Sequence, residues 1–174
     1  EVIRGPGATV WGANAVNGVI NIITKKAADT QGTLLTGGGG SFERGFVGVR
    51  YGGKLNEETP FRVYAKAFSR DPMHSLSGVS VRDDWQSARA GFRLDHSRGI
   101  DQLTVQGDVF INSIGDSLLQ PALTAPFTRL DIADAKEKGG NIRLRWDRNF
   151  SDKSSIMLQT YYDRVHNQLA PWTK

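Results

Sequence analysis

The feature that most constrains the fold of this chain is an alternation of apolar and polar residues, which dominates from about residue 44 onward. Successive side chains of a β-strand point to opposite faces, so a period of two predicts two-faced strands. Sustained helical periodicity is hard to find anywhere in the sequence. We therefore expect an all-β fold, with strands where the alternation is clearest: residues 61–69, 88–95, 103–112, 142–147 and 156–163.

The length of these runs carries information about the environment of the strands. Several runs keep the alternation for roughly ten residues, whereas strands in soluble domains typically have about 5–6. A strand that crosses a bilayer at a tilt needs about 9–11 residues. The mean hydropathy of −0.38 does not argue against a membrane, because only one face of such a strand meets lipid. The other face would line a polar interior and carries Arg62, Lys66, Arg89, Arg93, Arg143 and Arg145.

The connections between the runs alternate in length, which is a second signal. Short turns are expected at residues 56–60, 96–101 and 149–154, and longer polar connections at 71–84 and 113–136. This places the short turns at one end of the sheet and the long connections at the other, as in outer-membrane barrels. The connection at residues 39–44 is an exception because it is short. A soluble Greek-key sandwich stays open as an alternative.

Composition excludes several classes of protein. The chain has 22 Lys+Arg and 18 Asp+Glu, a net charge of +4, and the basic residues are scattered among acidic ones, which argues against a nucleic-acid partner. The absence of Cys excludes disulfide scaffolds, thiolate zinc sites and cysteine nucleophiles. The longest apolar runs have only a few residues, so no transmembrane helix is expected. There is also no starting Met and no signal-like segment, so we expect the chain to be an internal piece of a longer protein.

The first 26 residues have a different character, because small residues and glycines replace the alternation. A short strand at residues 1–3 is expected to break at Gly5-Pro6-Gly7, and a second strand rich in Val and Ile is expected at 18–24. Two phosphate-loop templates fail here. Val10 stands where a dinucleotide fingerprint requires its third glycine, and Ala13 stands where a Walker motif requires Lys.

This segment closely resembles the C-terminal part of the plug domain of TonB-dependent outer-membrane receptors. The residues that carry the resemblance are Arg4-Gly5-Pro6, the pair Trp11-Gly12, and the strand Gly-Val-Ile-Asn-Ile-Ile-Thr-Lys at 18–25. Trp11 is a mild departure, since Tyr is commoner at that position. The resemblance covers about 26 residues in detail, and the remainder matches in pattern as the first strands of a barrel.

The resemblance implies a protein of the bacterial outer membrane. Residues 1–28 would be the end of a plug domain, and residues 29–174 would form about seven strands of a transmembrane barrel that has about 22 when complete. Such a receptor imports a scarce nutrient, most often a ferric siderophore, with energy supplied through TonB. The implied partners are TonB, this small nutrient and outer-membrane lipid; no cofactor, nucleic-acid partner or enzymatic activity is expected. A soluble all-β binding module and a passive porin-type barrel are the alternatives.

Individual residues receive roles from the same resemblance. Arg4 is expected to anchor the plug to carboxylates of the barrel wall, and Asn14, Asn17 and His74 are candidates for contact with the substrate. The inner-face arginines would either steer an anionic ligand or simply neutralise plug carboxylates or the neighbouring Asp108 and Asp147, and the second account is favoured. No catalytic constellation and no metal site is expected. The residues expected to determine the fold of the plug motif are Gly5, Pro6, Trp11, Gly12 and Gly18.

Overall fold

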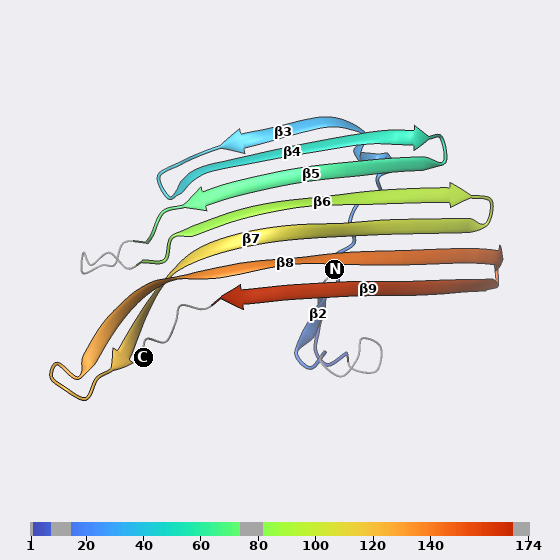
Figure 1. The fold of residues 1–174 in the computed structure, drawn as a ribbon. Coiled ribbons are helices and arrows are strands. Elements are labelled where there is room, and N and C mark those ends of the chain that lie inside the picture. The colour runs from blue at the N-terminus through green and yellow to red at the C-terminus, as the bar shows by residue number, and fades with distance from the viewer. Residues whose placement is uncertain (1, 8–14, 74–81, 169–174) are drawn as a thin grey trace.

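The computed structural model describes residues 2–7, 15–73 and 82–168. Its main element is a seven-stranded antiparallel sheet in which each strand pairs with the next one along the chain (Figure 1). The expected all-β class is confirmed. The strands are β3 (Gly32–Gly38), β4 (Glu43–Asn56), β5 (Thr59–Arg70), β6 (Trp85–Arg98), β7 (Asp101–Pro121), β8 (Thr128–Ser151) and β9 (Ser154–Gln168).

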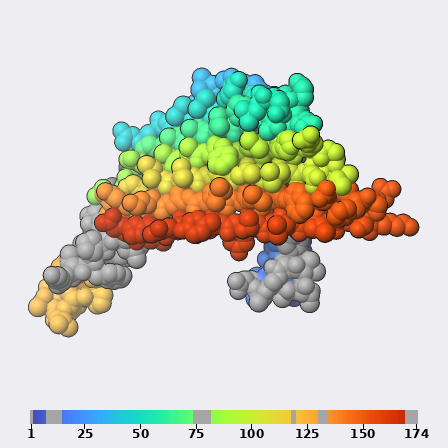
Figure 2. All heavy atoms as spheres, turned by 45° about the vertical axis from the view of Figure 1, so that its right-hand side comes forward, coloured from blue at the N-terminus to red at the C-terminus, as the bar shows by residue number. Residues whose placement is uncertain are grey.

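A smaller, two-stranded sheet lies at the start of the chain. Strand β1 (Val2–Arg4) pairs in antiparallel fashion with β2 (Gly18–Ile20), so the second strand is shorter than the sequence predicted. From β2 the chain runs across one face of the large sheet to the 3-10 helix η1 (Ala28–Thr30), which precedes β3. Figure 2 shows the seven strands as one layer in colour order, with the start of the chain projecting beneath them.

The strand register divides the large sheet into an apolar and a polar face. Side chains that face each other across neighbouring strands lie on the same face, and the pairing Val49–Ala65–Ala90–Val109 runs across four strands on the apolar face. Many of these side chains are largely exposed, because no second layer covers them in the described residues: Leu35 is 74% exposed and Val109 62%. Among the described residues, the buried apolar side chains are Ala15 and Ala27 alone.

The opposite face carries the charged side chains that the alternation assigned to it. Arg62 pairs with Arg93, which continues through Gln106 to Arg143, and Lys66 pairs with Arg89. The chain between β2 and β3 contacts this polar face and not the apolar one. We call the polar face the inner wall and the apolar face the outer face.

The long connection predicted at residues 113–136 is wrong, because most of it is a β-hairpin. Strands β7 and β8 stay paired as far as Pro121 and Thr128, and they extend past the other strands at the end of the sheet opposite the short turns (Figure 1). The predicted short connection between β3 and β4 is confirmed at residues 39–42, and the short turns lie between β4 and β5, β6 and β7, and β8 and β9.

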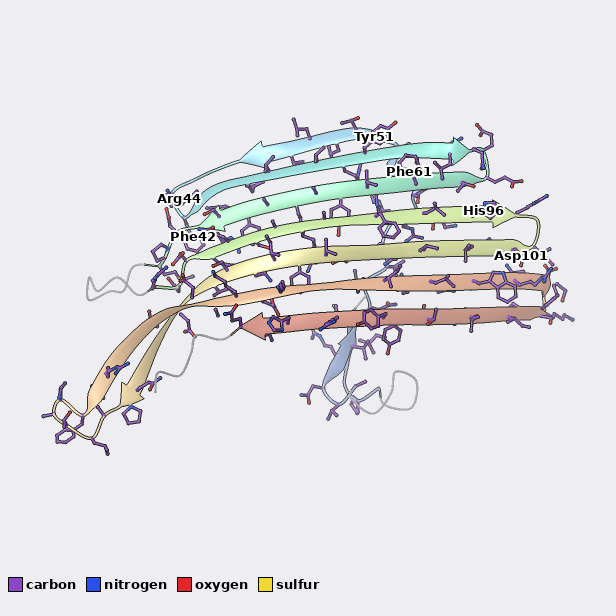
Figure 3. The ribbon with its side chains drawn as sticks, in the orientation of Figure 1. Phe42, Arg44, Tyr51, Phe61, His96 and Asp101 are labelled. Carbon is purple, nitrogen blue, oxygen red and sulfur yellow. The ribbon has the colours of Figure 1, made fainter. Side chains whose placement is uncertain are left out.

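Aromatic side chains mark the short-turn end of the outer face. The Tyr51 and Phe61 rings lie 6.0 Å apart, and Figure 3 shows both toward this end of the sheet, with Phe42 and Arg44 at the other. The indole Nε1 of Trp146 donates a hydrogen bond of 2.9 Å to Asp101. An aromatic ring with a polar partner suits the level where lipid meets water.

Candidate functional site

The most tightly packed place in the described chain is the contact between residues 24–31 and the inner wall, which we call the junction. Ala27 is completely buried there and Thr30 is 4% exposed. The Thr30 hydroxyl donates to the Ala27 carbonyl over 3.1 Å, and the Gln31 amide donates to the same oxygen over 2.8 Å. These local bonds form because η1 is one short turn whose carbonyl groups need partners.

A carboxylate of the wall receives the backbone of this segment. Asp95, in β6, accepts a hydrogen bond of 2.7 Å from the Ala27 N–H and one of 2.8 Å from the Thr104 hydroxyl. Both of its oxygens lie 3.0 Å from Nε of Arg93. Positions two apart on a strand share a face, so β6 itself places the two side chains together. They are only 11% and 14% exposed, which makes this pair better shielded from water than the other ion pairs of the described residues.

Two arginines donate from the wall to the crossing segment. Nη1 of Arg93 lies 2.8 Å from the Thr24 hydroxyl, and Nη1 of Arg62 lies 3.3 Å from the Lys25 carbonyl. Hydrogen bonds that involve a charged group are stronger than neutral ones. The junction is therefore held by charge-assisted bonds from two strands, β5 and β6, while Thr104 of β7 supports Asp95 within the wall.

A glycine allows the segment to approach the wall this closely. Gly52, in β4, is buried on the inner wall, and a Cβ atom there would overlap the Thr30 carbonyl oxygen and lie 2.8 Å from the Gln31 Cα. Those are backbone atoms, so they cannot turn aside as the end of a side chain can. Gly52 is therefore required by the close approach of two stretches of backbone.

The rest of the inner wall is only partly neutralised. Arg89 lies 3.7 Å from Asp108 and Arg145 lies 2.7 Å from Asp147, which confirms the expected pairing of inner arginines with neighbouring carboxylates. No carboxylate of the described residues is within ion-pair distance of Arg50, Lys66 or Arg143. These three cations therefore lie on the inner wall without an ion-pair partner among the described residues.

The residues of the predicted plug motif are distributed as follows. Arg4 ends β1, pairs with Gly18 and is exposed; its anchoring role stays a prediction. Gly5 has a φ of 94°, which disfavours side-chain-bearing residues, and its N–H donates to the Asn17 carbonyl over 3.3 Å. A Cβ on Gly18 would come within 2.8 Å of the Ile3 carbonyl oxygen. Pro6 lies between Gly5 and Gly7, whose N–H groups donate to the carbonyls of Asn17 and Ala15. The other predicted residues, Trp11, Gly12, Asn14 and His74, lie outside the described residues.

The junction residues Gly52, Arg93 and Asp95 were not predicted as a site. Their signal in the sequence is an Arg-x-Asp pair on the inward positions of a strand, but Arg145-x-Asp147 has the same signal and contacts no part of the crossing segment among the described residues. Within the same residues, no group of three or more His, Asp or Glu side chains is placed to hold a metal ion. No helix in this part of the chain is long and apolar enough to cross a membrane.

A one-layer antiparallel sheet with an uncovered apolar outer face and a charged inner wall defines the wall of a transmembrane β-barrel. Comparison with known proteins leads to the family. Over 97 residues the chain is 33% identical to vitamin B12 transporter BtuB of Vibrio cholerae, and over 93 residues it is 38% identical to the ferric enterobactin receptor of Pseudomonas aeruginosa. These alignments cover 56% and 49% of the chain. Both relatives are TonB-dependent receptors, and the similarity supports a fragment of such a receptor.

The matched part is a small share of each relative. It spans 15% of the Vibrio cholerae transporter and 11% of the Pseudomonas aeruginosa receptor. A second transporter of the same name, from Vibrio vulnificus, is 44% identical over 41 residues, which is 7% of its length. No protein-family model and no solved structure matches the chain.

Proposed function

We propose that the full-length protein is a TonB-dependent receptor of the bacterial outer membrane that imports a scarce nutrient, with a ferric siderophore as its substrate. One observation carries the proposal: the apolar outer face lacks a covering layer in the described residues, while the start of the chain is held on the charged inner wall. A soluble sandwich would bury its apolar face against a second sheet. The names of the relatives, a vitamin B12 transporter and a ferric enterobactin receptor, support uptake of a small metal-containing nutrient.

In this proposal residues 1–28 are the end of a plug and residues 29–174 are barrel wall. The junction lies at the boundary, because the Ala27 N–H is bonded to the wall and β3 begins at Gly32. Arg50, Lys66 and Arg143, which have no ion-pair partner among the described residues, favour an anionic partner near them in the interior, either plug carboxylates or an anionic chelate. Arg4 would add an anchor between plug and wall, through a carboxylate outside the described residues.

A charge on the outer face is expected to destabilise the barrel. Ile142 is 47% exposed on the outer face, and the adjacent Asn141 points to the inner wall. In the full-length receptor in lipid vesicles, Ile142→Arg should lower the free energy of unfolding by about 2–4 kcal/mol, because the charge must leave water for hydrocarbon. Asn141→Arg is the matched control and should change it little. Equal effects of the two substitutions, measured by urea titration, would contradict the assignment of the faces.

Uptake by cells tests the function itself. A strain that lacks the gene should lose energised uptake of a radiolabelled ferric siderophore, and the full-length gene should restore it only where TonB is present. Vitamin B12 uptake, measured in parallel, is expected to stay unchanged. Restored uptake in cells without TonB would favour a passive porin, and recovery of the protein in the detergent-free soluble fraction would favour a soluble binding module.

A further inference from the structure

Basic side chains gather on the outer face where β8 and β9 approach the long-connection end of the sheet. Lys138 pairs directly with His166, Gly140 pairs with Arg164, and Lys136 pairs with Gln168. These positions lie on the same face as Ile142, in the direction that the barrel presents to lipid. We call Lys136, Lys138, Arg164 and His166 the basic cluster; all of them are exposed.

The cluster has no acidic partner among the described residues. The nearby Glu137 and Asp163 each lie one residue away from a member of the cluster on the same strand. Successive side chains of a strand point to opposite faces, so these two carboxylates project from the inner wall. Asp134 is on the outer face but is paired with Arg82 over 2.7 Å. Like charges on neighbouring positions of a sheet are destabilising. Charge complementarity therefore favours an anion at this place.

An apolar groove leads into the cluster. A hollow of about 760 Å³ is lined by apolar Val109, Ile111, Ile142 and Tyr162 and by the basic Lys138 and Arg164. Gly140, between Val109 and Arg164 in the register, has no side chain to fill this space. A second hollow of about 480 Å³ continues over Ala88 and Ile111 to Lys136 and His166. An occupant must therefore combine an apolar body with an anionic head.

The height of the cluster matches the edge of a membrane. Lys136 lies ten residues along β8 from Trp146, which is about 33 Å of strand. At a strand tilt of about 40° this corresponds to about 25 Å along the membrane normal, the height of the apolar band of a transmembrane barrel. Trp146 marks the short-turn edge of that band, so Lys136 lies at the opposite edge, with Lys138 and His166 about 5 Å below it. Arg164 starts lower, and its long side chain can extend toward the head-group level.

We propose that the basic cluster and its groove bind a phosphorylated lipid of the outer leaflet. The lipid phosphate would accept hydrogen bonds from Lys136, Lys138 and Arg164, and an acyl chain would lie along Val109 and Ile142. This site deepens the proposed function, on which it rests for the placement of the barrel in the outer membrane. A lipid fits better than a free anion because the groove is apolar and opens onto the lipid-facing side.

Native mass spectrometry of the full-length receptor tests the site with matched probes. Phosphatidic acid and diacylglycerol with identical acyl chains differ only in the phosphate, so the parent protein should retain the first and not the second. The triple variant Lys136→Gln, Lys138→Gln, Arg164→Gln should retain at least about tenfold less phosphatidic acid than the parent protein, because it loses charge-assisted bonds. The control Lys54→Gln, Lys153→Gln removes positive charge near the short turns and should retain the lipid like the parent.

The outcomes separate the lipid site from its alternatives. Retention by the triple variant equal to that of the parent, or an equal loss in the control, would overturn the proposal, as would competition by millimolar inorganic phosphate. A conservative Lys136→Arg, Lys138→Arg variant should keep the lipid and shows that loss in the triple variant is a matter of charge. Heat-dependent gel mobility reports folding of each variant. A parent protein that retained phosphatidic acid without importing any nutrient would contradict the proposed transport and support the lipid site.

Discussion

Replacing Asp95 with alanine is expected to release residues 24–31 from the inner wall of the full-length receptor. The substitution leaves the Ala27 N–H without its acceptor at a completely buried position, and it leaves the Arg93 guanidinium without its carboxylate. Removing one partner of a shielded charge pair costs about 3 kcal/mol. Amide hydrogen exchange in peptides covering residues 24–31 should therefore become about 100-fold faster.

Asp147 provides a matched control for this experiment. It lies two residues after an arginine on the same face, and its oxygen is 2.7 Å from Nε of Arg145, but both side chains are more exposed. Asp147→Ala should leave exchange at residues 24–31 unchanged. Asp95→Asn keeps one acceptor oxygen for the Ala27 N–H and should have an intermediate effect. Equal acceleration by the two alanine variants would show that Asp95 has no specific role at the junction.

A methyl group at Gly52 should displace the same segment by a steric route. The new Cβ of Gly52→Ala would overlap the Thr30 carbonyl oxygen, so the backbone of η1 or of β4 has to move. Overpacking of this kind costs about 1–3 kcal/mol. Lys25 and Lys26 are exposed beside the junction, so trypsin should cut the folded variant after these residues faster than it cuts the parent protein.

Gly45 is the control for this substitution, because a Cβ there would lie 3.7 Å from its nearest neighbour, the Gly38 carbonyl oxygen, which is ordinary contact. Gly45→Ala should leave the rate of cleavage after Lys25 and Lys26 at the parent value. If Gly52→Ala were cut at the parent rate as well, the close approach at Thr30 would not hold the segment in place. The Asp95 and Gly52 variants thus probe the polar and the steric part of the same contact.

The sequence predicted the strands best where they have one apolar and one polar face. It failed at the far end of β7 and β8, where Arg129, Lys136 and Asp134 belong to strands that were expected to be a loop. Past the apolar band, both faces of a strand can carry polar side chains, so the period of two disappears while the backbone pairing continues. Only the register, which runs to Pro121 and Thr128, identifies this part as a hairpin.

The junction could not have been predicted from spacing. Ala27 and Asp95 are separated by 68 positions in the chain, and the Arg-x-Asp pattern occurs four times in the sequence, at residues 82–84, 93–95, 129–131 and 145–147. Among the described residues, the copy at Arg93 and Asp95 makes the contact. Which copy receives the crossing segment depends on where residues 21–31 pass over the sheet. Gly52 is similar, because nothing in its neighbourhood in the sequence indicates which backbone will approach it.

The sequence by itself determined the all-β class, the two faces of the strands and, through the motif around Arg4-Gly5-Pro6, the resemblance to TonB-dependent receptors. These properties follow from the local period of side chains along an extended backbone and from contiguous residues. The tertiary structure alone decided that Asp95 and Gly52 hold the segment before β3, and that Lys138 and His166 adjoin across two strands. The physical reason is that hydrogen bonds, steric fit and charge clustering depend on distances between atoms, and only the strand register brings distant positions together.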